Sequence, residues 1–410
     1  MKQSIWVVNK YSSSQEEGFE TRTMALAREW VRMGHDVVVF CSNANHFTGN
    51  QVMAAPIEHR IVDGIHVVRL RTLRYEKTAS LRRVLSWFDF ERRLLTSSLH
   101  GLPAPNVIIA SSLSLFSVIS GLVFSRRYKV PWVFEVRDIW PLTLVELGGV
   151  SRWHPFSLVL AVVERLGYSK ADLVVGTMPN LVEHVRSVVK RDVTVACVPF
   201  GFNPAMAPEA LPRGFEETKE APFVVGYAGS IGLSNALDTL IEAALILRDD
   251  PRFHFVIAGD GDKRTELMVA TRDCQNVSWL GRVPRSKVHE ILSGCDLLYF
   301  SGHKSAVWRY GMSLNKLTDY LLAARPILGS YSGFPSILDE ASCGRFIPAA
   351  DSTALVRALE DFRKMDLQAR AEMGERGRAW LFQNRTWARL AAGYAARLAS
   401  IASSSPEPTT

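Results

Sequence analysis

The strongest constraint on the fold is an alternation between short apolar runs rich in β-branched residues and segments with helical amphipathicity. In the first half, the segment TRTMALAREWVRMG (21–34) has apolar residues at helical spacing and lies between two such runs. The runs that we expect to be strands in this half are 4–8, 36–42, 106–111, 131–136 and 172–177. Alternating strands and helices indicate a parallel sheet with helices on both faces, so we predict an α/β fold.

A second α/β half follows a break in this pattern. Residues 200–222 are rich in proline, glycine and glutamate, and the alternation then begins again. The expected elements are strands at 223–229, 254–261, 277–281 and 297–301, helices at 236–248 and 284–293, and a final helix near 375–402. Because ligands bind off the carboxyl ends of strands in such sheets, we expect the functional site in the cleft between the two halves.

A chain of 410 residues is long enough for two domains of ordinary size. We place the N-terminal domain at 1–205 and the C-terminal domain at 206–380. The final helix then occupies 381–402, and the stretch SSSPEPTT indicates a disordered tail at 403–410. The five cysteines include no CxxC pair, which favours a reducing compartment and predicts no metal site. The N-terminal apolar run is too short for a signal peptide.

The positive charge of the chain lies in its first half. Residues 1–205 have 24 Lys and Arg against 17 Asp and Glu, whereas residues 206–410 have 24 of each. Within 74–95, Leu81, Leu85 and Phe88 have helical spacing between arginines. This composition is typical of a helix in a membrane interface, although an ordinary packed amphipathic helix has a similar pattern.

The arginines of that segment are Arg82, Arg83, Arg92 and Arg93. Basic and aromatic residues together also occur in nucleic-acid-binding proteins, but no recognised binding module is present, so we expect no nucleic acid partner. The uncharged stretch 106–125 is about as long as a spanning helix. Its serines and its β-like start favour a buried strand followed by a helix, so we predict no transmembrane segment.

Three loops are candidates for ligand contacts. In YAGSIGLSNALDTLIEAA (227–244), glycines follow a strand and either hold phosphate oxygens or only make a tight turn. Neither this loop nor AGDGDKR (258–264) has the GxGxxG spacing, so an NAD site is disfavoured. In VNKYSSSQEEGFETR (8–22), the polar loop is either a surface loop or a flexible loop over a ligand.

Two clusters of charged residues follow predicted strands or begin a helix. Glu135, Arg137 and Asp138 follow an apolar strand and either contact a substrate or form a structural ion pair beside a turn. Lys316 and Asp319 lie near the same edge of a helix that is expected to end at Arg325-Pro326. A lysine at this position is unexpected, because the positive end of a helix dipole disfavours a cation.

Several segments occur in the order expected of a known enzyme family. They are FEVRDIWP, GYAGSIGLSNALDTLIEAA, FVIAGDGDKR, VSWLGRVP and SLNKLTDYLLAARPIL. Over about residues 1–395, the chain resembles retaining GT-B glycosyltransferases of family 4. More narrowly, it resembles bacterial transferases of amino sugars, of the L-fucosamine type, in O-antigen and capsule assembly. No single motif is decisive, but the ordered set is specific.

The resemblance implies a GT-B fold, with two Rossmann-like parallel-sheet domains facing a central cleft and a C-terminal helix crossing back to the first domain. The second domain is then expected to bind a nucleotide-sugar donor, UDP-linked, and the first domain to bind the acceptor. No cofactor and no metal are expected. The residues that the resemblance places near the donor are Gly18, Gly229, Ser230, Asn235, Gly259, Arg282, Val283, Ser313, Leu314, Asn315 and Asp319.

Within this set, Gly229, Ser230 and Asn235 stand where the family binds the diphosphate, and Arg282 and Val283 where a backbone loop meets the base. Asp319 occupies the second acidic position of the family's E-x7-E motif and is expected on the ribose. The chain departs from the family at Ser230 and Asn235, where an arginine and a lysine are usual. It departs again at Gly311, which replaces the first acidic residue.

These departures suggest a role for Lys316. An anion between the lysine and the free N–H groups of the helix would interact with both. We therefore expect Lys316 to replace the missing cations and neutralise the leaving diphosphate; the alternative is that it extends into solvent. Arg137, where many relatives have a histidine, is expected to stabilise charge as well. Glu135 or Asp138 would orient the acceptor.

The resulting expectation is a transferase that moves an N-acetylated amino or deoxy sugar from a UDP-sugar to a polyprenyl-diphosphate-linked saccharide. It would act in O-antigen or lipopolysaccharide synthesis, peripheral on the inner, cytoplasmic face of the membrane through residues 74–95. Two rivals remain open. One is a GT-B UDP-sugar epimerase, and the other is an inactive GT-B relative that serves as a membrane-associated assembly partner.

Overall fold

The computed structural model of the chain describes residues 2–45, 48–77, 80–207, 221–232, 235–335 and 337–403. Most of the expected polar linker, at 208–220, and most of the expected tail, at 404–410, lie outside the described residues. The chain divides into two compact units. The first comprises Met1–Gly201 and Trp387–Thr410, and the second comprises Phe202–Thr386.

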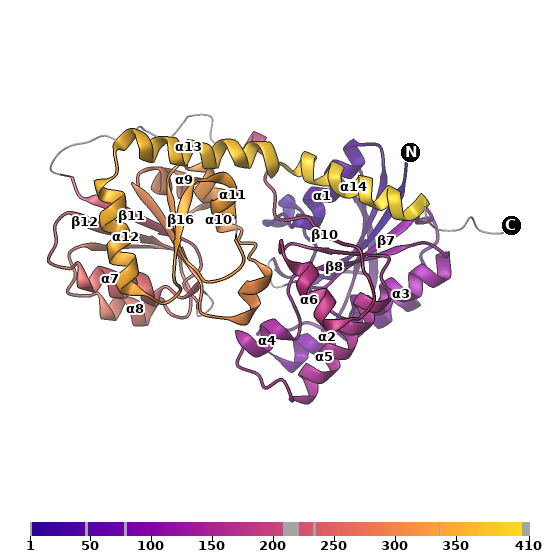
Figure 1. Cartoon of the computed structure of the whole chain (residues 1–410). Coiled ribbons are helices and arrows are strands. Elements are labelled where there is room, and N and C mark those ends of the chain that lie inside the picture. Colours follow the sequence, from indigo (N-terminus) through magenta and orange to yellow (C-terminus); the bar gives the residue numbers. More distant parts are fainter. Residues whose placement is uncertain are drawn as a thin grey trace. The chain divides into compact units, whose positions relative to one another are not determined.

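The first unit is built on a sheet whose described strands have the order β10-β9-β8-β7-β1-β2-β6-β5 (Figure 1). Every pair is parallel except β5 with β6. The strands are β1 (Ser4–Val8), β2 (Asp36–Ser42), β5 (Ile57–Val62), β6 (Ile65–Leu70), β7 (Val107–Ser111), β8 (Trp132–Val136), β9 (Leu173–Gly176) and β10 (Val195–Cys197). A short antiparallel pair, β3 (Ala44–Asn45) and β4 (Gly49–Asn50), lies apart from this sheet. Central strands such as β1 and β7 are buried along their whole length, which explains why they appear in the sequence as continuous apolar runs.

Helices cover both faces of this sheet. On one face, Trp30 of α1 (Arg22–Arg32) packs edge-on against Tyr394 of α14 (Trp387–Ser403), with ring centroids 5.4 Å apart. On the opposite face are α2 (Leu81–Thr96), α3 (Ser117–Tyr128) and α5 (Pro155–Lys170). Gly167 of α5 allows a close approach to the sheet, because an added Cβ would lie 2.8 Å from the Phe134 ring. The remaining helices are η1 (Gln15–Glu17), α4 (Leu142–Glu146) and α6 (Leu181–Val188).

The second unit has a fully parallel sheet with the order β13-β12-β11-β14-β15-β16 among its described strands. The strands are β11 (Phe223–Ala228), β12 (Phe253–Ala258), β13 (Val277–Gly281), β14 (Leu297–Ser301), β15 (Ile327–Ser330) and β16 (Gly344–Ile347). The helices are η2 (Pro204–Met206), α7 (Asp238–Ile246), α8 (Arg264–Ala270), α9 (Arg285–Ser293), η4 (Ala306–Tyr310), α10 (Lys316–Leu322), α11 (Ile337–Ala341), α12 (Ser352–Lys364) and α13 (Leu367–Asn384). The core on one face gathers α7 and α12, and that on the other gathers α10 and α13.

The structure corrects the expectation of one final helix at 375–402. Two helices, α13 and α14, are separated at Arg385 and Thr386. Arg385 has φ −124° and ψ 14°, and its carbonyl accepts a hydrogen bond from the Phe202 amide at 2.9 Å. The chain entering the second unit is therefore bonded to the chain leaving it, and this pairing interrupts the helix.

The uncharged stretch 106–125 forms β7 and most of α3, as expected. Among the described residues, none of the helices combines the length and apolar character needed to span a bilayer.

Candidate donor site and the charged residues of the first unit

In the second unit, glycines allow the loops after neighbouring strands to touch. Gly229 follows β11 and Gly259 follows β12, with Gly259 at φ +141°. A Cβ at Gly259 would lie only 1.8 Å from the Gly229 carbonyl oxygen, so no larger residue fits without displacing backbone. The Gly229 amide donates to Ala258 O at 3.0 Å and the Gly259 amide to Gly281 O at 2.7 Å. The carboxyl ends of three parallel strands, where ligands bind in such sheets, are thereby held together.

Lys316, the first residue of α10, reaches this loop. Its ammonium donates to Asn235 Oδ1 at 2.6 Å and to the Tyr227 hydroxyl at 3.0 Å. The same nitrogen lies 4.7 Å from the centroid of the Tyr227 ring. A Cβ added to Gly229 would lie 3.2 Å from it. The lysine therefore lies over the glycine loop and does not extend into solvent.

Among the described residues, the ammonium of Lys316 has no counter-ion. Both hydrogen-bond acceptors are neutral, and no described carboxylate forms an ion pair with it. The side chain is half-buried, and burial lowers the pKa of Lys316 to about 8. An unpaired cation of this kind is stabilised by an arriving anion. The arrangement can therefore bind an anionic group beside the glycine loop.

Buried tyrosines fix this position. The Tyr227 hydroxyl donates to the Ser230 carbonyl at 2.6 Å. The Tyr320 hydroxyl accepts from the Ala228 amide at 3.0 Å and lies 3.0 Å from the Tyr299 carbonyl. Sequence reasoning missed both hydroxyls, because a tyrosine within an apolar run such as FVVGYAG is expected only to fill the core.

The other expected donor residues surround this loop or follow neighbouring strands. Asp319 is half-buried, and burial raises its pKa. Arg285 Nη2 lies 4.0 Å from its Oδ1. Arg282 is exposed and Val283 half-buried in the loop after β13. Ser230 contributes its carbonyl to Tyr227, while the residue itself is exposed. The remaining three, which immediately precede α10, are Ser313, Leu314 and Asn315.

Gly311, which replaces the first acidic residue of the family motif, has a backbone conformation that favours glycine. Its φ is +92°, in the left-handed region. Gly311 directly follows η4 and is buried. A glutamate at this position would have both a strained backbone and a carboxylate to accommodate.

In the first unit, Glu135 is part of a buried ion pair. Its Oε2 lies 2.6 Å from Arg22 Nη1, and both side chains are almost fully buried. Arg22 also donates to the Val198 carbonyl at 2.7 Å, so the pair joins β8, α1 and the segment after β10. This ion pair favours a structural role, while the expectation that Glu135 orients an acceptor stays a prediction. The carboxylate takes part in a structural ion pair, which is the alternative that the sequence left open.

Arg137 and Asp138 remain candidates at the carboxyl end of β8. The Arg137 guanidinium lies 4.8 Å from the Phe200 ring centroid, and among the described residues its Nε has no hydrogen-bond partner. Burial lowers the pKa of Arg137 to about 10, so it stays charged at neutral pH. Asp138 is exposed. Both residues therefore remain candidates for contact with an anionic or hydroxyl-bearing ligand.

Gly18 ends η1 with a φ of +92° and is exposed. The preceding Glu17 accepts from the Ser14 amide at 2.9 Å and pairs with Arg69 of β6. The loop is therefore bonded to the sheet through Glu17, and Gln15, Glu16 and Gly18 are its exposed residues.

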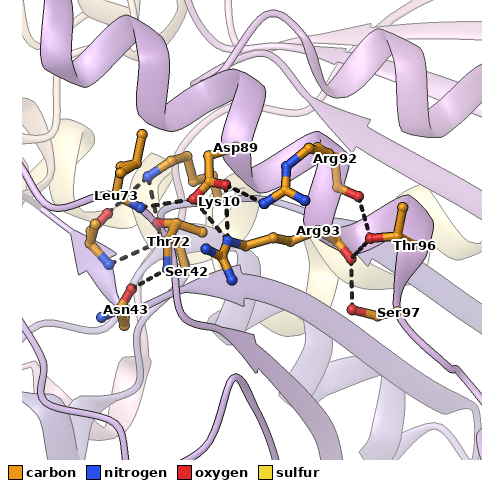
Figure 2. A network of polar contacts seen from close by, with 11 residues as sticks. Lys10, Ser42, Asn43, Thr72, Leu73, Asp89, Arg92, Arg93, Thr96 and Ser97 are labelled. Atoms are coloured by element: carbon orange, nitrogen blue, oxygen red, sulfur yellow. Dashed lines mark hydrogen bonds and ion pairs between the residues drawn. The ribbon is translucent and has the colours of Figure 1, made fainter.

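The polar network of Figure 2 fixes α2 to the ends of three strands. Asp89 of α2 accepts a hydrogen bond from the Leu73 amide at 3.0 Å, just beyond β6. The adjacent Thr72 shares a 2.6 Å hydrogen bond with Ser42 at the end of β2. The buried Lys10, beyond β1, donates to the same serine at 3.4 Å. The helix is thus a fixed part of the first unit.

This network changes the reading of the basic segment 74–95. Arg92 and Arg93 both donate to the network aspartate at 2.9 Å. Arg83 is half-buried and donates to the Tyr11 hydroxyl at 3.3 Å. Arg82 is exposed. Three of the four arginines that predicted contacts with lipid headgroups therefore have partners within the protein.

Comparisons with known proteins agree with this architecture. Residues 17–201 match the family model of the glycosyl transferase 4-like domain, and residues 212–380 match that of glycosyl transferases group 1. None of the curated proteins matches the chain significantly.

Solved structures with this fold cover nearly the whole chain. HepE of Anabaena, in complex with UDP and glucose, is 14% identical with a TM-score of 0.65 and covers 97% of this chain and 100% of its own. Sucrose-phosphate synthase of Thermosynechococcus elongatus is 15% identical with a TM-score of 0.69, covering 98% and 100%. The E. coli trehalose-6-phosphate structure bound with UDP-2-fluoro glucose is 11% identical with a TM-score of 0.72, covering 96% and 98%.

Two parallel-sheet α/β units, the paired domain matches and these structural neighbours confirm the GT-B fold. The chain is a glycosyltransferase of this fold, with the 4-like domain in its first unit and the group 1 domain in its second.

Proposed function

We propose that this glycosyltransferase moves a sugar, an N-acetylated amino or deoxy sugar, from a UDP-linked donor to a lipid-linked saccharide. The observation that supports a diphosphate donor most directly is the unpaired Lys316 ammonium held over the glycine loop by Asn235 and Tyr227. UDP in the structures of HepE is a second support, since those chains share the fold.

The proposed chemistry relies on charge stabilisation. Breaking the sugar–phosphate bond leaves negative charge on the diphosphate, so a cation already fixed beside it stabilises the transition state. Lys316 takes this role in the second unit, and Arg137 keeps the charge-stabilising role that the resemblance implies for it. In the retaining route that we propose, the acceptor attacks from the leaving-group face and a phosphate oxygen receives its proton. Asp138 orients the acceptor hydroxyl, and Asp319 binds the ribose.

The acceptor proposal rests on charge and on the resemblance to O-antigen transferases. All of the net positive charge lies in residues 1–205, which include the 4-like domain. A polyprenyl-diphosphate-linked saccharide at the inner face of the cytoplasmic membrane has the anionic character that such a surface attracts. The protein would then act as a peripheral membrane enzyme in surface polysaccharide synthesis.

The test measures UDP release from a panel of UDP-sugars, with and without a polyprenyl-diphosphate-linked saccharide. Acceptor-dependent UDP release with transfer of the sugar to lipid supports the proposal. A second arm offers soluble sugar phosphates, because the structural neighbours include sucrose-phosphate and trehalose-6-phosphate proteins. Transfer only to those acceptors would contradict the lipid-linked assignment. Free sugar released without any acceptor indicates the epimerase, and no release in any arm indicates an inactive relative.

A further inference from the structure

Helix α5 is apolar on the side that faces away from its own sheet. Leu158, Val159, Val162 and Leu166 are 45%, 47%, 69% and 38% exposed. The opposite side of the same helix is already buried, as Leu160 illustrates with no exposed surface. A helix that is apolar all round inside a folded unit is expected to contact something on its outer side as well.

A similar surface continues on α2. Leu81, Leu85 and Phe88 recur at helical spacing and are 78%, 50% and 45% exposed. The two helices meet where the Trp87 ring of α2 stacks on the Phe156 ring of α5, with centroids 6.5 Å apart. Figure 1 places α2, α3 and α5 on one side of the first unit's sheet. We call the outer apolar residues the α2/α5 face: Leu81, Leu85, Phe88, Leu158, Val159, Val162 and Leu166.

The exposed charges within α3 and α5 have one sign, although exposed acids lie in neighbouring segments at Glu76, Asp138, Glu146 and Asp172. In α3 and α5, which are described throughout, no acidic side chain is exposed. The one acidic residue of these two helices, Glu164, is buried and lies 2.7 Å from His184. Exposed basic residues in or just after the two helices are Arg126, Arg127, Lys129, Arg165 and Lys170.

This charge pattern decides between two occupants. A second copy of the chain, packed symmetrically through α5, would bring the basic residues of both copies together, and α3 and α5 expose no acids to compensate them. An anionic bilayer supplies negative headgroups at the rim and an apolar region at the centre. The exposed pattern matches the bilayer.

We infer that the α2/α5 face docks on an anionic membrane surface, with its leucines, valines and Phe88 entering the interfacial region. Because Arg83, Arg92 and Arg93 have internal partners, the apolar side chains of α5 supply more of the affinity than the arginines of α2 do. The inference rests on the proposed function in one respect: the purpose of the membrane contact is access to a lipid-linked acceptor.

The test uses the full chain and vesicles, without any sugar nucleotide. Co-sedimentation compares phosphatidylglycerol-containing vesicles with phosphatidylcholine vesicles. The variant Val162→Glu places a charge at the most exposed position of α5 and is expected to weaken binding by about tenfold or more. The matched control is Val269→Glu in α8 of the second unit, a helical valine that is 61% exposed, and it should bind like the parent. Arg92→Gln should weaken binding far less than Val162→Glu does.

Three results would overturn the inference: no association with anionic vesicles, equal losses in Val162→Glu and its control, or a larger loss in Arg92→Gln. A parent protein that is dimeric without vesicles, and becomes monomeric on Val162→Glu, would also overturn it in favour of a second copy. UDP release with a detergent-solubilised lipid acceptor is measured separately on all variants. For the parent, sugar transfer without vesicle binding shows that the membrane inference has failed, and vesicle binding without sugar transfer shows that the proposed function has failed.

Discussion

The Asn235 amide oxygen accepts a hydrogen bond from the Lys316 ammonium at 2.6 Å, across 81 positions of the chain. The bond joins the loop after β11 to the first turn of α10. Asn235 stands where the resemblance leads one to expect a lysine, and the cation is supplied instead from the helix. The chain thus places one positive charge at this loop from a different element, with a neutral residue to hold it.

The pH dependence of UDP binding should follow the protonation of this lysine. Burial lowers the pKa of Lys316 to about 8, below the ordinary lysine value, so its charge is present below that pH and lost above it. The affinity for UDP should therefore be highest below pH 8 and fall as pH rises through about 8. Titration calorimetry across this range measures the effect. A Lys316→Ala variant with the same pH profile as the parent would refute the assignment.

Removal of the Glu135 carboxylate should lower the free energy of unfolding, and this loss is its main expected effect. Glu135→Ala leaves Arg22 buried and unpaired, which costs about 3–5 kcal/mol. Chemical unfolding measures this loss. The double variant Arg22→Met/Glu135→Leu removes both charges and should recover most of the free energy of unfolding. If Glu135→Ala unfolded like the parent but lost turnover, Glu135 would belong to the acceptor site after all.

Gly259→Ala should destabilise the second unit strongly. Its Cβ would lie 1.8 Å from the Gly229 carbonyl oxygen, at a φ of +141°. Displaced backbone and dihedral strain together cost about 3 kcal/mol or more. The control is Gly34→Ala, which has φ +87° but open space around the new Cβ, and should cost only about 1 kcal/mol. Equal unfolding free energies for the two variants would show that the loop packing is loose.

Most of the parallel strands could be predicted from sequence because burial on both faces makes them continuous apolar runs, but the parallel strands β6, β10 and β16 were not predicted. Strand β5 was missed, since its exposed residues interrupt the apolar pattern. The turn after it held the missing signal: Asp63-Gly64, with φ values of +51° and +78°, is a typical hairpin turn between alternating residues.

The site was predictable only where local sequence determines it. Lys316 stood out because a cation at a helix start is locally unfavourable. The role of Glu135 depended on Arg22, 113 positions away, and no pattern in one sequence reports such a pairing. The tyrosine hydroxyls near Lys316 were hidden for the same reason, because Tyr320 bonds to Ala228 across 92 positions.

The central claim is that Lys316 neutralises the diphosphate of the donor. Its most direct test is the steady-state rate of acceptor-dependent UDP release by Lys316→Ala, compared with Lys304→Ala, an exposed lysine of the same unit. The account predicts that Lys316→Ala loses about 10²- to 10³-fold in kcat and binds UDP more weakly, while Lys304→Ala resembles the parent. A folded Lys316→Ala protein with parental turnover and parental UDP affinity would contradict it.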